Sequence, residues 1–85
     1  MLKVVTVDRR RIGTLVDSQD EFFIVELGRV FRSRRALPKR YAKVIPDENM
    51  IVMQVSSETL RKSPRVKDRS KLNMRQLRRF YAPDE

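Results

Sequence analysis

The pattern of hydrophobic and polar positions over the first two thirds of the chain predicts short β-strands. Apolar residues, many of them β-branched, recur in brief runs at 2–7, 12–17, 41–45 and 50–56, which is typical of strands. Turn-forming Asp, Asn, Ser and Pro residues separate several of these runs. Five or six short strands without intervening helices predict a mainly β fold, a small antiparallel β-barrel or sandwich.

The strongest predicted strand, at 21–27, is apolar on both faces. Phe23, Val25 and Leu27 alternate with Phe22 and Ile24, and alternate residues of a strand point to opposite sides of the sheet. One face therefore fills the barrel. The other face, with Phe22 and Ile24, is predicted to be an interface that the C-terminal tail or a second copy of the chain covers.

The last third of the chain predicts one helical turn and one amphipathic helix. A turn at 57–60 is followed by a polar linker at 65–70 and by a helix at about 71–81, for which Asp68 or Ser70 is the candidate N-cap. The apolar stripe of this helix is predicted to dock on the barrel or on a second copy, which favours a homodimer. The stripe consists of Met74, Leu77, Phe80 and Tyr81.

Charge divides the chain unevenly. The 85 residues carry a formal net charge of +9. Residues 1–60 hold 11 bases and 8 acids, whereas residues 61–85 hold 9 bases and 3 acids. At this length we expect one barrel domain, residues 1–64, with residues 65–85 as a basic linker and C-terminal helix. A basic tail of this kind favours contact with nucleic acid or with another acidic partner.

The densest positive charge lies between residues 29 and 43. This segment has no acid and contains two aromatic residues, Phe31 and Tyr41, whose rings either stack on nucleic-acid bases or pack in the core. Its cations are predicted to contact phosphates, together with three arginines of the tail helix. The candidate nucleic-acid-binding residues are Arg29, Arg32, Arg34, Arg35, Lys39, Arg40, Lys43, Arg75, Arg78 and Arg79.

The composition argues against catalysis and against a bound cofactor. The chain has no Cys and no His, which removes thiolate and imidazole ligands, nucleophiles and bases. The acids at 17–21 fit a turn better than a catalytic or metal site. With two glycines there is no phosphate-binding loop, and no apolar run is long enough to span a bilayer. We expect a cytoplasmic protein that is not an enzyme, with no cofactor, no metal and no membrane attachment.

Three segments between residues 12 and 64 form a recognisable pattern. They are Ile12-Gly13-Thr14-Leu15-Val16-Asp17, then Leu37-Pro38 followed by Ala42 and Ile45, and finally the run from Ile51 to Leu60 ahead of Pro64. These segments resemble PRC-barrel and related small stress-associated barrel domains. This resemblance implies a compact barrel that acts as a binding module or adaptor and converts no substrate. An Sm-like RNA-binding barrel is a weaker alternative, because its opening helix and paired motifs are not found.

Taken together, these features predict a non-catalytic module that binds RNA or a ribonucleoprotein through a basic surface. The alternative is an adaptor of PRC-barrel type that binds or assembles with proteins. In that case the positive charge meets an acidic protein surface.

Overall fold

The structure is a computed structural model that describes residues 2–28, 30–67 and 71–82. In these residues, strands dominate and two helices follow them. The strands are β1 (Lys3–Val5), β2 (Arg11–Ser18), β3 (Phe22–Leu27), β4 (Ser33–Pro38), β5 (Ala42–Ile45) and β6 (Met50–Met53), and the helices are α1 (Ser57–Lys62) and α2 (Met74–Tyr81). Two short 3-10 turns, η1 (Lys39–Tyr41) and η2 (Pro46–Glu48), flank β5. The prediction of a mainly β fold with a C-terminal helix is confirmed.

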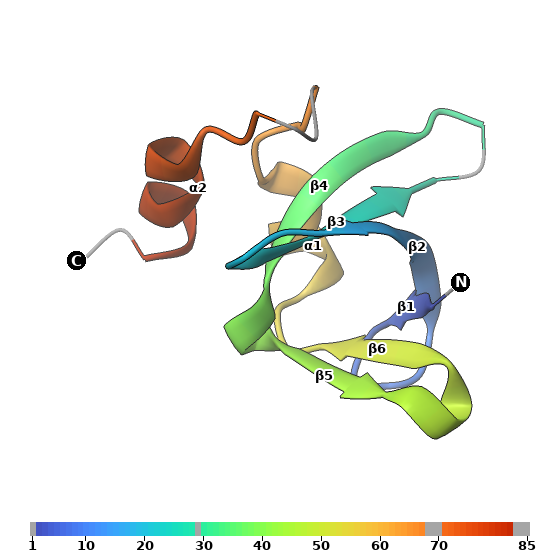
Figure 1. Cartoon of the computed structure of the whole chain (residues 1–85). Coiled ribbons are helices and arrows are strands. Elements are labelled where there is room, and N and C mark those ends of the chain that lie inside the picture. The colour runs from blue at the N-terminus through green and yellow to red at the C-terminus, as the bar shows by residue number, and fades with distance from the viewer. Residues whose placement is uncertain (1, 29, 68–70, 83–85) are drawn as a thin grey trace.

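The strands form one sheet in the order β4-β3-β2-β1-β6-β5, which curls into a half-barrel (Figure 1). Neighbouring strands run antiparallel with one exception. The exception is β1 and β6, which run parallel with Val4 opposite Ile51. This pair differs from the predicted antiparallel barrel, because alternation along a strand reveals its two faces but not its neighbour's direction.

One face of the sheet holds the main hydrophobic core, and the assignment of β3 is confirmed. Val25 and Leu27 are buried in this core and Phe23 packs against it. Strands from both halves of the sheet and α1 contribute to it, so the core joins distant parts of the sequence. Its buried members are Val4, Val25, Leu27, Leu37, Ile51, Met53 and Leu60.

Helix α1 lies between the two ends of the curved sheet (Figure 1). Ser56 caps it, because its hydroxyl oxygen accepts a hydrogen bond from the Thr59 N–H at 3.1 Å. The helix runs to Lys62, which is longer than the single turn predicted. Leu60 is fully buried in the main core, so α1 is fixed against the sheet.

The opposite face of β3 and β4 is covered by α2. Phe22, Ile24 and Ala36 form a second buried cluster with Leu77 of α2. Met74 and Tyr81 pack around this cluster. The predicted interface is therefore formed within one chain, so the exposed apolar face that favoured a homodimer is not free. The homodimer itself stays a prediction.

Helix α2 begins later than the sequence pattern predicts. Its first residue is Met74, and its N-cap is Asn73. The Asn73 side chain accepts a hydrogen bond from the Gln76 N–H at 3.1 Å, which satisfies one of the free donors of the first turn. The predicted caps, Asp68 and Ser70, lie outside the described residues.

The two edge strands of the sheet differ in how they are covered. On the outer side of β4, the segment that follows α1 forms a backbone hydrogen bond. The Val66 N–H donates to the Arg34 carbonyl at 2.9 Å. The Tyr81 hydroxyl donates to the Ala36 carbonyl at 2.6 Å. At the other edge, β5 pairs with β6 on one side. In the part of the chain that the structure describes, no segment pairs with its other side.

Tyr81 makes stability depend on pH in the alkaline range. Burial raises the pKa of Tyr81, and Ser63 and Arg35 offset part of that rise. A group whose pKa is raised by folding stabilises the fold fully below its unfolded pKa, about 10 for tyrosine, and loses this contribution as the pH rises through the folded pKa. We therefore expect the free energy of unfolding to fall as pH increases above about 10.

The measurement is chemical denaturation from neutral to alkaline pH, with Tyr81→Phe as the comparison. The variant loses the hydrogen bond to Ala36, about 1 kcal/mol. Phenylalanine does not titrate, so the variant also lacks the part of the alkaline fall in the free energy of unfolding that is due to Tyr81. The difference in the free energy of unfolding between the natural protein and the variant therefore shrinks as the pH rises. A difference in the free energy of unfolding that stays constant across this pH range would contradict a raised pKa for Tyr81.

Candidate nucleic-acid interface

The loop between β1 and β2 is a compact turn that positions Arg10. The Thr6 N–H donates to the Arg10 carbonyl at 2.9 Å, and the Arg10 N–H donates to the Thr6 hydroxyl at 3.2 Å. Arg9, in the left-handed region with φ 69°, pairs with Glu48 at 2.8 Å across the molecule. The loop is thereby tied to η2, and the Arg10 side chain is left at the surface.

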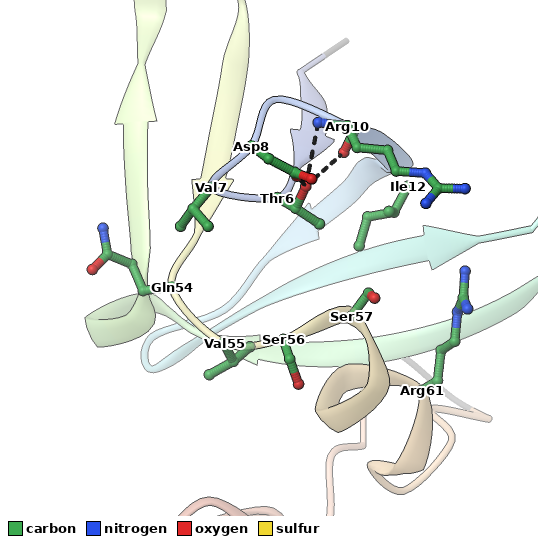
Figure 2. A pocket seen from close by; sticks show the side chains of 10 residues that line it. All are labelled: Thr6, Val7, Asp8, Arg10, Ile12, Gln54, Val55, Ser56, Ser57 and Arg61. Atoms are coloured by element: carbon green, nitrogen blue, oxygen red, sulfur yellow. Dashed lines mark hydrogen bonds between the residues drawn. The ribbon is translucent and has the colours of Figure 1, made fainter.

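Arg10 and Arg61 line the same hollow, which has a volume of about 510 Å³. Its walls are the β1–β2 loop on one side and the start of α1 on the other. Figure 2 shows the Arg61 side chain extending from α1 toward that loop, with Ser56 and Ser57 at the base of the helix. Because Leu60 anchors α1 in the core, the neighbouring Arg61 is held at the surface.

A second hollow continues from the first and adds two more arginines. It has a volume of about 610 Å³ and is lined by Arg11 and Arg32 as well as by Arg10 and Arg61. Gly28, at the end of β3, also lines it. We call the two joined hollows with their four arginines the basic groove. It brings together a loop, the start of β2, the β3–β4 connection and α1.

Among the described residues, two carboxylates line the basic groove, fewer than its arginines. Asp8 lines the first hollow, where a hydrogen bond from Thr6 lowers its pKa. Glu26 lines the second and contacts Arg32 at 3.5 Å and Arg34 at 3.6 Å. One carboxylate shared between two arginines leaves a net positive field, and such exposed ion pairs contribute only about 0 to 1 kcal/mol each.

A second group of predicted cations lies at the other end of β3. Lys39, Arg40 and Arg78 line a separate hollow of about 310 Å³ with Glu21. Arg78 donates two hydrogen bonds to Glu21, one of them at 3.2 Å, and this pairing lowers the pKa of Glu21. From Glu21 to Gly28 the extended chain covers about 20 Å at about 3.3 Å per residue, so this group is distinct from the basic groove.

Among the described residues, Arg35, Lys43, Arg75 and Arg79 line neither the basic groove nor the hollow at Glu21. Arg35 is half-buried and donates a hydrogen bond to the Ser63 carbonyl at the end of α1. Burial and the nearby Arg65 lower the pKa of Arg35. Lys43 is exposed on β5, and Arg29 lies outside the described residues. Arg75 and Arg79 are exposed on α2. The structure therefore does not place the ten candidate cations on one patch.

The two candidate stacking residues have different environments. Phe31 is 92% exposed in the β3–β4 connection. Tyr41 is half-buried, packs against the main core and has its ring centroid 6.4 Å from that of Tyr81. The Arg40 guanidinium lies over the Tyr41 ring at 5.0 Å. Of the two rings, Phe31 is the more exposed to solvent.

The sequence prediction did not include Arg10, Arg11 or Arg61. A run of three arginines at 9–11 separates the predicted strands at 2–7 and 12–17. Because charged residues between two strands form a surface loop, this run was itself a signal for a cationic site. Arg61 carried no signal of its own, since its proximity to Arg10 depends on how α1 packs.

The described residues hold no group of three or more acidic, His or Cys side chains that would suit a metal ion. Among these residues, neither helix has the length and apolar character needed to cross a bilayer. The chemistry offered by the basic groove is therefore that of hydrogen-bond donors and positive charge.

Comparison of the chain with protein-family models, with curated proteins and with solved structures found no match. The resemblance to PRC-barrel domains stays a prediction from the sequence segments described above.

Proposed function

We propose that this protein is a non-catalytic module of PRC-barrel type that binds RNA or a ribonucleoprotein through the basic groove. The observation that carries the proposal is the convergence of Arg10, Arg11, Arg32 and Arg61 on one continuous concave surface. Guanidinium groups are suited to phosphates because their planar donors match the phosphate oxygens.

Several arginines of the basic groove can contact a polyanion without losing an existing ion pair. Among the described residues, Arg10, Arg11 and Arg61 form no ion pair with a carboxylate. Arg11 contacts the Thr14 hydroxyl at 3.3 Å, a neutral partner. Engaging them with phosphates thus breaks no ion pair, whereas Arg78 would first have to leave Glu21.

The proposal predicts RNA binding that weakens steeply with salt. If four phosphates are neutralised on a single strand, raising the salt from about 50 to 200 mM weakens binding about 50-fold. The measurement is fluorescence anisotropy of a labelled single-stranded RNA of about 12 nucleotides, within the site sizes of small barrels. For the variant Arg10→Glu/Arg61→Glu, we expect binding at least about 10-fold weaker at low salt and a shallower salt dependence.

The matched control is Arg75→Glu/Arg79→Glu, which makes the same change in net charge on exposed positions of α2. Thermal melts establish that both variants fold. An equal loss of affinity in the two variants would show that overall charge, and not the basic groove, drives binding. If the natural protein binds RNA no more tightly than micromolar and without salt dependence, the protein-binding adaptor replaces this proposal.

A further inference from the structure

We infer that Phe31 stacks on an unpaired base, so that the partner of the basic groove is a single strand and not a duplex. This inference rests on the proposed function and specifies its ligand. The first observation is exposure: Val30 is 83% and Phe31 is 92% exposed. Burying a phenylalanine is favourable relative to leaving it in water, and this ring gains almost none of that stabilisation within the chain.

The β3–β4 connection is closed tightly at its base. The last pair of the two strands is Leu27 with Ser33. Gly28 follows with φ +88°, and a Cβ built on it would lie 2.6 Å from the Phe31 carbonyl oxygen. Only glycine adopts this backbone conformation without strain. The turn that leads toward Phe31 therefore depends on a glycine at position 28.

Phe31 is adjacent to the basic groove in sequence, and its backbone lies close to Gly28, which lines the second hollow. Arg32, the next residue, lines the second hollow together with Gly28, Arg10 and Arg61. No acidic residue occurs from Gly28 to Ile45. A ligand for this surface must therefore combine negative charges with a flat apolar group. Unpaired nucleotides have both, because each base has an exposed ring face beside its phosphate.

A duplex does not offer the same contact. Its bases are stacked on one another, and double-stranded RNA is bound chiefly through phosphates and 2′-hydroxyls. An anionic membrane also combines charge with apolar groups, but Arg10 and Arg61 line a hollow that a flat bilayer does not enter. A flexible strand reaches both the hollow and the exposed ring, so the geometry favours the single strand.

The test uses the fact that the chain contains no tryptophan. Phe31→Trp places one fluorophore at the connection, and Val44→Trp, at a 42% exposed position on β5, is its control. Titration with single-stranded RNA should quench the fluorescence of the Phe31→Trp variant and leave that of the Val44→Trp variant unchanged. The same sequence as a duplex should leave both unchanged. Quenching of both variants by the single strand, or of the Phe31→Trp variant by the duplex, overturns the inference.

Affinity gives a second measurement. Because stacking on an aromatic ring is worth about a 5- to 150-fold change in affinity per base, Phe31→Ala should weaken single-strand binding by that factor. Phe31→Leu, which keeps an apolar side chain without a π-face, should lie near Phe31→Ala, whereas Phe31→Trp should bind as the natural protein does. Duplex binding should be equal in all four proteins.

The outcomes separate this inference from the proposed function. If Phe31→Ala binds single strands normally while Arg10→Glu/Arg61→Glu does not, the basic groove binds RNA and Phe31 plays no part. If no nucleic acid binds the natural protein, both proposals fail. Vesicles of phosphatidylserine and phosphatidylcholine are the third ligand: a blue shift of the Phe31→Trp emission with vesicles, without quenching by RNA, would assign the exposed ring to a lipid surface instead.

Discussion

Replacing Leu77 by alanine is expected to lower the free energy of unfolding by about 2 to 4 kcal/mol. Leu77 is 2% exposed and is the residue of α2 that is buried with Phe22, Ile24 and Ala36. Truncating a buried leucine removes its transfer free energy and leaves a cavity. For a domain of this size, whose total stability is marginal, the loss is large. Urea denaturation followed by circular dichroism measures it.

The control for Leu77→Ala is Gln76→Ala, at an exposed position in the same helix. We expect this change to lie within about 0.5 kcal/mol of the natural protein. Limited proteolysis distinguishes two ways in which the Leu77 variant can fail, because detachment of α2 alone makes the tail susceptible while the sheet stays protected. An unchanged midpoint and an unchanged protease pattern would show that α2 does not pack on the sheet in solution.

Gly13→Ala is expected to have an effect of similar size on the sheet itself. A Cβ at this position would lie 2.3 Å from the Glu26 carbonyl oxygen and 3.0 Å from a methyl carbon of Leu27. The nearest atom belongs to the backbone of Glu26, so no side-chain rotation can relieve the clash. Strand β2 must therefore move away from β3. We expect a loss of about 3 kcal/mol, at the upper end of the range for overpacked sites.

The comparison for Gly13→Ala is Ser18→Ala, at an exposed position at the end of the same strand. Both changes leave an alanine in β2, but only the first adds an atom where the adjacent strand already lies. Thermal and urea denaturation of the two variants should therefore differ by several degrees in Tm for a domain of this size. If the two variants were equally stable, β2 and β3 would not pair in the register in which Gly13 faces Leu27.

The fold was more predictable from the sequence than the candidate site. Strand positions and the two faces of β3 follow from alternation, which is a local property. The site depends on which strands become neighbours and on how α1 packs. Arg34 and Arg35 show the difference: they are adjacent in sequence, but neighbouring residues of a strand point to opposite faces. Arg34 accordingly meets Glu26, and Arg35 meets the end of α1.

The dense run of charge between residues 29 and 43 is divided for the same reason. Strand β4 separates Arg32 from Lys39 and Arg40, which lie in η1, so the segment reaches from the basic groove to the opposite end of β3. Conversely, Arg10 and Arg61 are about fifty positions apart in the sequence and line one hollow. Counting charges within a window of sequence therefore predicts that cations reach the surface but not which of them come together there.

The unequal edges of the sheet limit how copies of this protein can join through backbone hydrogen bonds. The margin at β4 is already occupied by Val66 and Tyr81 of the same chain, whereas the β5 margin remains open in the part of the chain that the structure describes. A filament needs two complementary margins on every subunit. A subunit with one open margin can add one other copy through backbone hydrogen bonds. Strand addition then joins two molecules β5 to β5 about a two-fold axis and ends at a closed pair.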